Sequence, residues 1–184
     1  MIALLSVITL FACEGNYKNI QQLSIKDNAP VGDGEGIRTV YTDSGRVVST
    51  MITEKVLNFE NLNFGYQEFP QGIEVHFWDE EDRETVVTSS YAIQFSGTEI
   101  VDLREDVVVT THDSTVVNAK QLYWDQKNRW VFTDEPYKIT LPDGSFNNGA
   151  GFDSNEDFTQ FLSRKNDGIQ LIEKKETNTE TDDQ

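Results

Sequence analysis

The residues that could do metal chemistry in this chain are few. Its two histidines, His76 and His112, have no metal-ligand partners at close spacing, and each is expected on a solvated strand face. The acidic run at residues 79–82 could bind Ca²⁺, but a hairpin turn is also expected there, and the turn is favoured. Residues 153–157 start like a calcium-binding EF-hand loop, but Phe158 then replaces the required glycine and Arg164 replaces the bidentate glutamate. We therefore predict no metal site.

Catalytic motifs are absent from the sequence as well. It contains no Gly-x-Ser-x-Gly, no His-Glu-x-x-His and no phosphate-binding Gly-rich loop. Paired carboxylates for glycoside hydrolysis could be drawn from its 32 acidic residues, but nothing singles out a pair. We therefore expect no enzymatic activity and no cofactor, and a carboxylate-based hydrolase is the third-ranked alternative.

The residue with the most specific predicted chemistry is Cys13. The apolar, uncharged run at residues 1–12 is shorter than the roughly 20 residues that a membrane-spanning helix needs, but it suits the core of a signal peptide. Leu10 and Ala12, three positions and one position before the cysteine, resemble a bacterial lipobox. We expect cleavage before Cys13 and lipid attachment to its sulfur; a plain secretory signal or a short buried segment is the alternative. A single cysteine also excludes an intrachain disulfide.

The charge balance limits the partners of this chain. Lys and Arg number 15 against 32 Asp and Glu, which gives a net charge of −17. A nucleic-acid binder needs a basic footprint, and docking on anionic headgroups by charge alone needs one too, so neither is expected. The aromatic share of 11% is too high for a disordered acidic chain, so the acidic residues must decorate a folded body.

Four segments follow from the composition along the chain. Residues 1–12 are the predicted lipoprotein-type signal peptide, and residues 13–36, which are polar and rich in glycine, are a predicted flexible tether. Residues 173–184 are almost wholly polar or charged and read as a disordered acidic tail. One folded domain is expected between them, at residues 37–172.

The elements that must position any site in this domain are β-strands. Runs of Val, Ile, Thr and aromatic residues are broken about every 8 to 12 residues by Asp, Gly, Asn or Pro, which predicts strands at 46–53, 72–78, 85–95, 100–110 and 115–124. The four prolines are expected at breaks and none inside a strand. Turns are predicted at residues 142–144 and 166–168. For residues 154–162 we prefer a loop followed by a strand to a short helix.

An internal repeat organises these strands. Val101, Val107, Val109, Asp113 and Ala119 recur thirty residues later as Val131, Tyr137, Ile139, Asp143 and Gly149. A second pattern is a small residue followed by an aliphatic and an aromatic residue, at Ser90, Ile93 and Phe95 and again at Ala119, Leu122 and Trp124. Stacked units of this kind build a curved sheet with two unpaired edges, here near residues 37–42 and 169–172. The prediction is an all-β, open, elongated roll; an ordinary sandwich is the alternative.

A series of short segments, in order along the chain, resembles the lipopolysaccharide-export protein C (LptC) family. They are residues 41–51, 69–75, 107–109, 121–125, 140–144 and 151–155, and the resemblance covers about residues 38–168. It implies a β-jellyroll of the type found in lipopolysaccharide transport, an LptA/LptC-like twisted roll with free edge strands at both ends. It also implies a place on the periplasmic side of the inner membrane. Family members typically have an N-terminal transmembrane helix, whereas this chain offers a lipobox-like segment, so a lipid anchor is expected.

The same resemblance implies a carrier function in lipopolysaccharide export. The protein would accept lipopolysaccharide from the permease subunits of an inner-membrane ABC transporter and pass it to a periplasmic LptA-like bridge protein by edge-strand addition. The runner-up is a surface lipoprotein that binds glycan or another protein through a β-sandwich.

An apolar groove in the curved sheet would shield the acyl chains. Alternation along the strands selects its predicted lining, for which plain core packing is the alternative. The predicted lining is Leu57, Phe59, Val75, Phe77, Ile93, Phe95, Val107, Val109, Leu122, Trp124, Ile139 and Leu141. The change of side between Ala119 and Leu122 predicts a bend or bulge that would help to open the groove.

Overall fold

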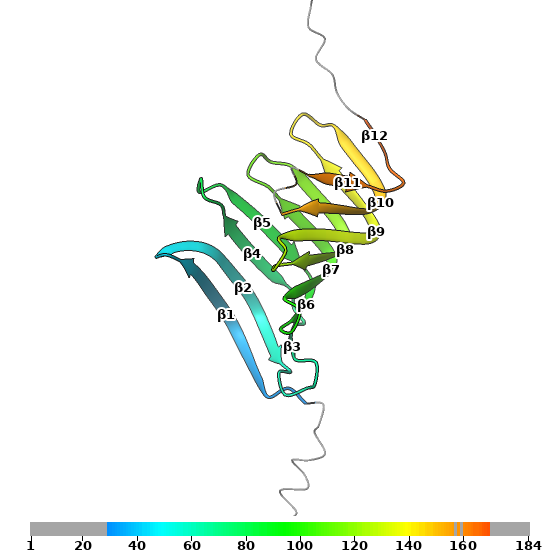
Figure 1. Ribbon diagram of the computed structural model, residues 1–184. Helices are drawn as coiled ribbons and strands as arrows, with labels where there is room; N and C mark the ends of the chain where they lie inside the picture. Colours follow the sequence, from blue (N-terminus) through cyan, green and yellow to red (C-terminus); the bar gives the residue numbers. More distant parts are fainter. Residues whose placement is uncertain (1–28, 157, 159, 170–184) are drawn as a thin grey trace, which may run out of the picture.

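The computed structural model describes residues 29–156, 158 and 160–169 of the chain. Cys13, the predicted signal peptide, most of the predicted tether and the predicted tail lie outside the described residues. Every regular element within them is a β-strand (Figure 1). This part of the chain holds no helix long and apolar enough to cross a membrane.

The strands form one antiparallel sheet that runs from β1 at one end to β11 and β12 at the other (Figure 1). They are β1 (Gly32–Asp43), β2 (Arg46–Asn58), β3 (Tyr66–Phe69), β4 (Ile73–Trp78), β5 (Glu84–Ser89), β6 (Tyr91–Phe95), β7 (Ile100–Thr110), β8 (Val116–Asp125), β9 (Trp130–Thr140), β10 (Phe146–Asn155), β11 (Phe161–Ser163) and β12 (Asp167–Ile169). The predicted all-β, elongated roll is confirmed.

The sheet folds over on itself into two layers, because the long strands β7 to β10 contribute one half to each layer. One half of β7 pairs with β5 and the other with β6, and one half of β10 pairs with β12 and the other with β11. We call the part that contains β1, β2, β4, β5 and β12 the first layer, and the part that contains β3, β6 and β11 the second layer. The apolar core lies between them.

A line of irregular backbone marks where the long strands bend. The pairing register shifts after Arg104 in β7, after Ala119 in β8 and after Ala150 in β10, and Glu105 and Asp106 take positive φ values of 58° and 52°. Such bulges bend a strand and increase its twist. The bulge predicted after Ala119 is confirmed.

Pro136 lies on the same line, inside β9 and opposite Ala150, so the expectation that no proline lies inside a strand is wrong. The register shifts on both neighbouring strands, β8 and β10, at this level. A residue that cannot donate a ladder hydrogen bond is tolerated where bulges already interrupt the ladder.

The predicted repeat corresponds to two hairpins of the same geometry, β7–β8 and β9–β10. Val107 pairs with Ala119 as Tyr137 pairs with Gly149. In the turns, the Asp113 carboxylate accepts a hydrogen bond from the Thr115 N–H at 3.1 Å, and the Asp143 carboxylate accepts one from the Ser145 N–H at 2.8 Å. Hydrogen bonds from the Thr111 hydroxyl and the Thr115 backbone lower the pKa of Asp113. Asp113 therefore closes its turn as an ionised acceptor, and Asp143 accepts a hydrogen bond at the equivalent place in its own turn.

The predicted strand at residues 85–95 is in fact two strands, β5 and β6, which lie in different layers. The break comes at Ser90, whose N–H donates to the Glu105 carbonyl oxygen at 2.9 Å, in the bulge of β7. The chain therefore passes from the first layer to the second at Ser90, beside the bend of β7.

The two ends of the sheet also differ from the prediction. β1 begins at Gly32, before the predicted start of the domain at residue 37, because the glycines of this segment let extended backbone pair closely with β2; a Cβ at Gly34 would lie 3.0 Å from the Ile37 side chain. The predicted turn at residues 166–168 is instead largely β12, in which Gly168 pairs with Asn147. A Cβ at Gly168 would lie 2.3 Å from the Phe146 carbonyl oxygen, so glycine permits this approach. Of residues 154–162, the first two end β10 and the last two belong to β11, so the preferred strand is present, and the described residues between them are not helical.

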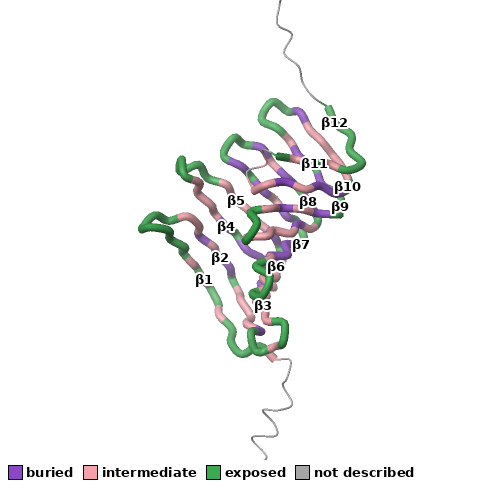
Figure 2. The backbone as a smooth tube through the Cα atoms, in the orientation of Figure 1, coloured by how far each residue is buried: buried purple, intermediate pink, exposed green. Residues whose placement is uncertain are grey.

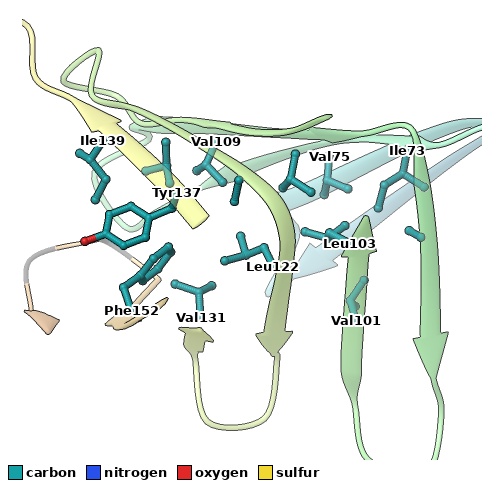
Figure 3. Packing of buried hydrophobic residues seen from close by; sticks show 14 of the residues in the cluster. Ile73, Val75, Val101, Leu103, Val109, Leu122, Val131, Tyr137, Ile139 and Phe152 are labelled. Carbon is teal, nitrogen blue, oxygen red and sulfur yellow. The ribbon is translucent and has the colours of Figure 1, made fainter. Parts of the chain in front are cut away.

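The core depends on rows of apolar side chains that cross the sheet. In the first layer, cross-strand pairs join one such row from strand to strand. Figure 2 shows buried residues along these strands. The members of the row are Met51, Val75, Val87, Val109, Val117 and Ile139. Such pairs of β-branched residues are the unit of sheet stabilisation. Figure 3 shows Ile139, Val109 and Val75 facing Phe152, Val131 and Leu122 of the second layer.

Candidate functional site

Three adjoining hollows lie between the two layers, and we name them by their position along the sheet. The β1-end hollow has a volume of about 200 Å³, the middle hollow about 360 Å³ and the β12-end hollow about 790 Å³. Ligand pockets of proteins commonly measure about 300 to 1,000 Å³. The space is therefore sufficient for a ligand and widens toward β12.

Shared lining residues join the three hollows into one groove. Phe77 and Trp124 line both the β1-end and the middle hollow. Thr111, His112 and Phe158 line both the middle and the β12-end hollow. The groove therefore follows the long axis of the sheet, from Tyr41 near one edge to Ile169 at the other.

The wall of the groove is mostly apolar and comes from both layers. In the middle hollow, Val87 and Val109 of the first layer face Leu122 and Val131 of the second. These side chains face inward because they occupy alternate positions of their strands. In β8 the bulge after Ala119 keeps both Ala119 and Leu122 on the inner side.

Charged side chains lie on the turns at the rims and pair with one another. On the first-layer rim Arg83 Nε donates to the Asp79 carboxylate at 2.6 Å. On the second-layer rim Arg129 Nε donates to Glu156 Oε2 at 2.8 Å. All four residues line the middle hollow. The charged groups closest to the middle hollow are therefore paired with each other, and an apolar chain can enter between them without removing water from an unpaired charge.

Most of the predicted lining residues lie on the inner side of the sheet. Val75, Phe77, Val109, Leu122, Trp124, Ile139 and Leu141 line the hollows. Val107 is 1% exposed and belongs to the core beneath them. The structure brings these residues together from β4, β7, β8 and the end of β9; their contact with a lipid stays a prediction.

The other four predicted residues, Leu57, Phe59, Ile93 and Phe95, line none of the three hollows and lie on the outer side of the sheet, around β3 and β6. Ala92, not Ile93, pairs with the inward-facing Leu103. The sequence pattern aligned Ser90 with Ala119, whereas the pairing aligns Ala92 with Leu122, since both are partners of Leu103. A shift of one residue moves a whole strand's side chains to the other face. Phe59 and Phe95 instead pack on either side of Tyr66, at ring-centroid distances of 4.7 and 6.2 Å.

An aromatic cluster at the β12 end was missing from the predicted lining. Phe161 packs against both Tyr137 and Phe152, at 5.8 and 5.1 Å between ring centroids, and Phe158 lies 6.2 Å from Phe152. Phe158 and Phe161 line the β12-end hollow. The repeat contained Tyr137 but matched it to Val107, and the apolar spacing of Phe158 and Phe161 was assigned to an alternative helix.

This arrangement can hold an elongated apolar ligand along the sheet, with polar parts of the ligand outside the rims. Among the described residues, no group of His, Cys, Asp and Glu is arranged to hold a metal ion. The chemistry that the groove offers is burial of hydrocarbon, which contributes about 0.8 kcal/mol per CH₂ group.

The most pronounced electrostatic arrangement away from the groove surrounds His76 on β4. Its Nε2 lies 2.8 Å from Glu74 Oε1 and its Nδ1 lies 2.8 Å from Glu84 Oε1. These hydrogen bonds, first to Glu74 and then to Glu84, raise the pKa of His76 above its ordinary value of 6.5. His76 therefore stabilises the outer side of the first layer when it is protonated, and it does not line the groove.

We expect this histidine to make folding stability depend on pH. The folded-state pKa is the higher one, so the stabilisation is complete below pH 6.5 and is lost as the pH rises through the folded-state value. Urea unfolding across this pH range gives the slope of the unfolding free energy against pH. That slope should be present in the wild type and absent in His76→Gln. His112→Gln, in the exposed β7–β8 turn, is the control and should keep the slope; an unchanged slope in His76→Gln would contradict the assignment.

Comparison with known proteins identifies the family. No curated protein matches the sequence. The model of the family described as lipopolysaccharide-assembly, LptC-related, matches residues 1–162. That match spans most of the chain, including strands β1 to β10. The chain therefore belongs to the LptC-related family of lipopolysaccharide-assembly proteins and has a role in lipopolysaccharide transport.

Proposed function

We propose that this protein carries lipopolysaccharide by holding its acyl chains in the groove, while the sugars and phosphates stay in water. The observation that supports this most is the row of three adjoining hollows between the layers, mostly apolar along its wall and with paired charges at its rims. Acyl chains cannot cross water unshielded, because each exposed CH₂ group costs about 0.8 kcal/mol. An open groove lets a lipid enter sideways and leave again.

The charge of the protein agrees with binding through the acyl chains. A phosphorylated glycolipid is anionic, and a chain with a net charge of −17 offers no general cationic surface for it. Affinity therefore comes from hydrocarbon burial. No nucleotide-binding motif occurs in the sequence, so the energy for directed movement comes from a partner.

The edges of the sheet are the proposed docking sites for the partners. β1 pairs only with β2, and β11 and β12 pair only with β10, so each end of the sheet has an edge with no partner strand among the described residues. Strand addition at an edge continues both the sheet and its groove into a protein of the same fold. We propose permease subunits of an inner-membrane ABC transporter as the partner at one edge and a periplasmic LptA-like bridge protein at the other.

A lipid anchor at Cys13 would hold the protein on the periplasmic side of the inner membrane. The support is the lipobox-like Leu10-Phe11-Ala12 directly before the cysteine. Two or more acyl chains anchor a protein stably, whereas one chain binds only reversibly.

One observation favours a second candidate function, glycan or protein binding on the outer face of the second layer. Tyr123 and Phe132 stack there with 5.2 Å between ring centroids, beside the half-buried Trp130. Planar aromatic faces of this kind suit sugar rings or a protein surface.

A matched pair of tryptophan substitutions separates the two functions. Trp124→Arg places a charge in the groove, and we expect it to weaken binding of fluorescently labelled lipopolysaccharide, measured by anisotropy, by at least about tenfold, because the guanidinium must be desolvated. Trp130→Arg makes the same change on the outer face and should bind like the wild type. If Trp130→Arg alone loses binding, or if soluble sugar competes fully, the outer-face function replaces the carrier function.

Photo-crosslinking tests the proposed edges. Benzoylphenylalanine at Val40 on β1 and at Leu162 on β11, which are 41% and 66% exposed, should crosslink to two different proteins in cells, one at each edge. The control position is Phe64, which is 81% exposed in the β2–β3 loop, and it should give neither product. Identical products from all three positions would argue against docking by strand addition.

Cell fractionation tests the proposed anchor. The wild type should stay with membranes, and Cys13→Ser should be found in the soluble periplasmic fraction, since the modified sulfur is absent. Ser6→Ala, within the same apolar segment, is the control and should fractionate like the wild type. Membrane retention of Cys13→Ser would show that the anchor does not depend on this residue.

A further inference from the structure

The contact between Phe77 and Trp124 divides the groove. Phe77 comes from β4 in the first layer and Trp124 from β8 in the second, and the rings meet edge to face with 4.7 Å between centroids and 81° between planes. Both side chains line the middle hollow and the β1-end hollow. An extended hydrocarbon chain that passes from one hollow into the other must separate these two rings.

A residue on the rim fixes the position of Trp124. The indole Nε1 donates a hydrogen bond to Glu156 Oε1 at 2.7 Å, while Glu156 Oε2 accepts one from Arg129 Nε at 2.8 Å. The Glu156 N–H also donates to the Arg129 carbonyl oxygen at 3.2 Å, which ties the carboxylate's backbone to the neighbouring turn. Glu156 side-chain exposure is only 24%, so its hydrogen bonds are partly shielded from water. Charge-assisted hydrogen bonds of this kind are the stronger ones.

We propose that Phe77 and Trp124 form a gate for fatty acyl chains and that Glu156 is the latch that holds Trp124 closed. This inference rests on the carrier function proposed above and adds a specificity to it. With the gate closed, acyl chains occupy the middle and β12-end hollows, and short chains bind without disturbing the rings. A long chain that extends toward β1 must break the hydrogen bond between Trp124 and Glu156 or displace Phe77. The gate therefore penalises long chains and sets how far they extend along the groove.

The test compares ligands that differ only in chain length. Calorimetric titration of the full chain with short-chain and long-chain lysophosphatidylcholine gives an affinity for each. Glu156→Ala removes the acceptor of the indole, and we expect it to raise the ratio of long-chain to short-chain affinity on the order of tenfold, the weight of one charge-assisted hydrogen bond. Phe77→Ala should have the same effect. The double variant should bind the long chain no more tightly than either single variant, because releasing either ring is enough to open the gate.

Two further variants separate the latch from general effects. Glu80→Ala removes an equal charge from an exposed position on the opposite rim and should behave like the wild type. Glu156→Gln keeps an acceptor for the indole and should preserve the length discrimination in a folded protein. In a Trp78→Phe, Trp130→Phe chain only Trp124 fluoresces, and Glu156→Ala should shift its emission to the red and increase its quenching by acrylamide without any ligand.

The outcomes distinguish the gate from the carrier function. Binding of both lysolipids with the same length dependence in the wild type, Glu156→Ala and Phe77→Ala overturns the gate and leaves the carrier function standing. Unchanged emission and quenching of Trp124 in Glu156→Ala overturn the latch. No binding of either lysolipid by the wild type and by Phe77→Ala overturns the carrier function and the gate with it.

Discussion

The constraint on which this structure depends is that each long strand must turn both of its apolar halves toward the same interior. A regular strand cannot do this while it bends, because its side chains alternate strictly between two faces. At the bend the inward side chains of β8 and β10 change parity, from Ala119 to Leu122 and from Gly149 to Phe152, while the neighbouring strands β7 and β9 carry the extra residue of each register shift. Without these register shifts the second layer would present its apolar side chains to water, and no groove would exist.

The sheet keeps two open edges. Strands β7, β5, β4, β2, β3 and β6 pair in a ring, but β1 and the pair β11 and β12 stay at opposite ends and do not pair with each other. Exposed edges are usually a liability, since they invite pairing with other chains. In a family devoted to lipopolysaccharide assembly the same property suits a carrier that must extend into neighbouring proteins. The groove extends to the same two edges, from Tyr41 near one to Ile169 at the other.

The distribution of charge complements this architecture. The chain has a net charge of −17, and among the described residues most acidic side chains lie on turns and outer faces, where they stay hydrated; on the groove rims Asp79 pairs with Arg83 and Glu156 with Arg129. The interior is left to apolar contact. The indole N–H of Trp124, which enters the groove, has a fixed partner in Glu156, so this part of the apolar wall also has a defined shape.

The sequence by itself determined the strand content, the thirty-residue repeat with its Asp113 and Asp143 turns, the bulge after Ala119 and the inner row through Val75, Val109 and Ile139. These are local properties, set by side-chain alternation, turn chemistry and the limits of backbone conformation. Tertiary structure alone decided which strand faces meet. Ile93 and Phe95 have the same spacing as Leu122 and Trp124, yet they face outward, because Leu103 selects Ala92 as its neighbour in β6. The aromatic cluster of Phe152, Phe158 and Phe161, the place of Pro136 inside β9 and the contact of Phe77 with Trp124 depend likewise on register between segments distant in sequence. Register states which residues of two strands lie opposite each other. The alternation of side chains within one strand does not determine which residues of the partner strand it faces.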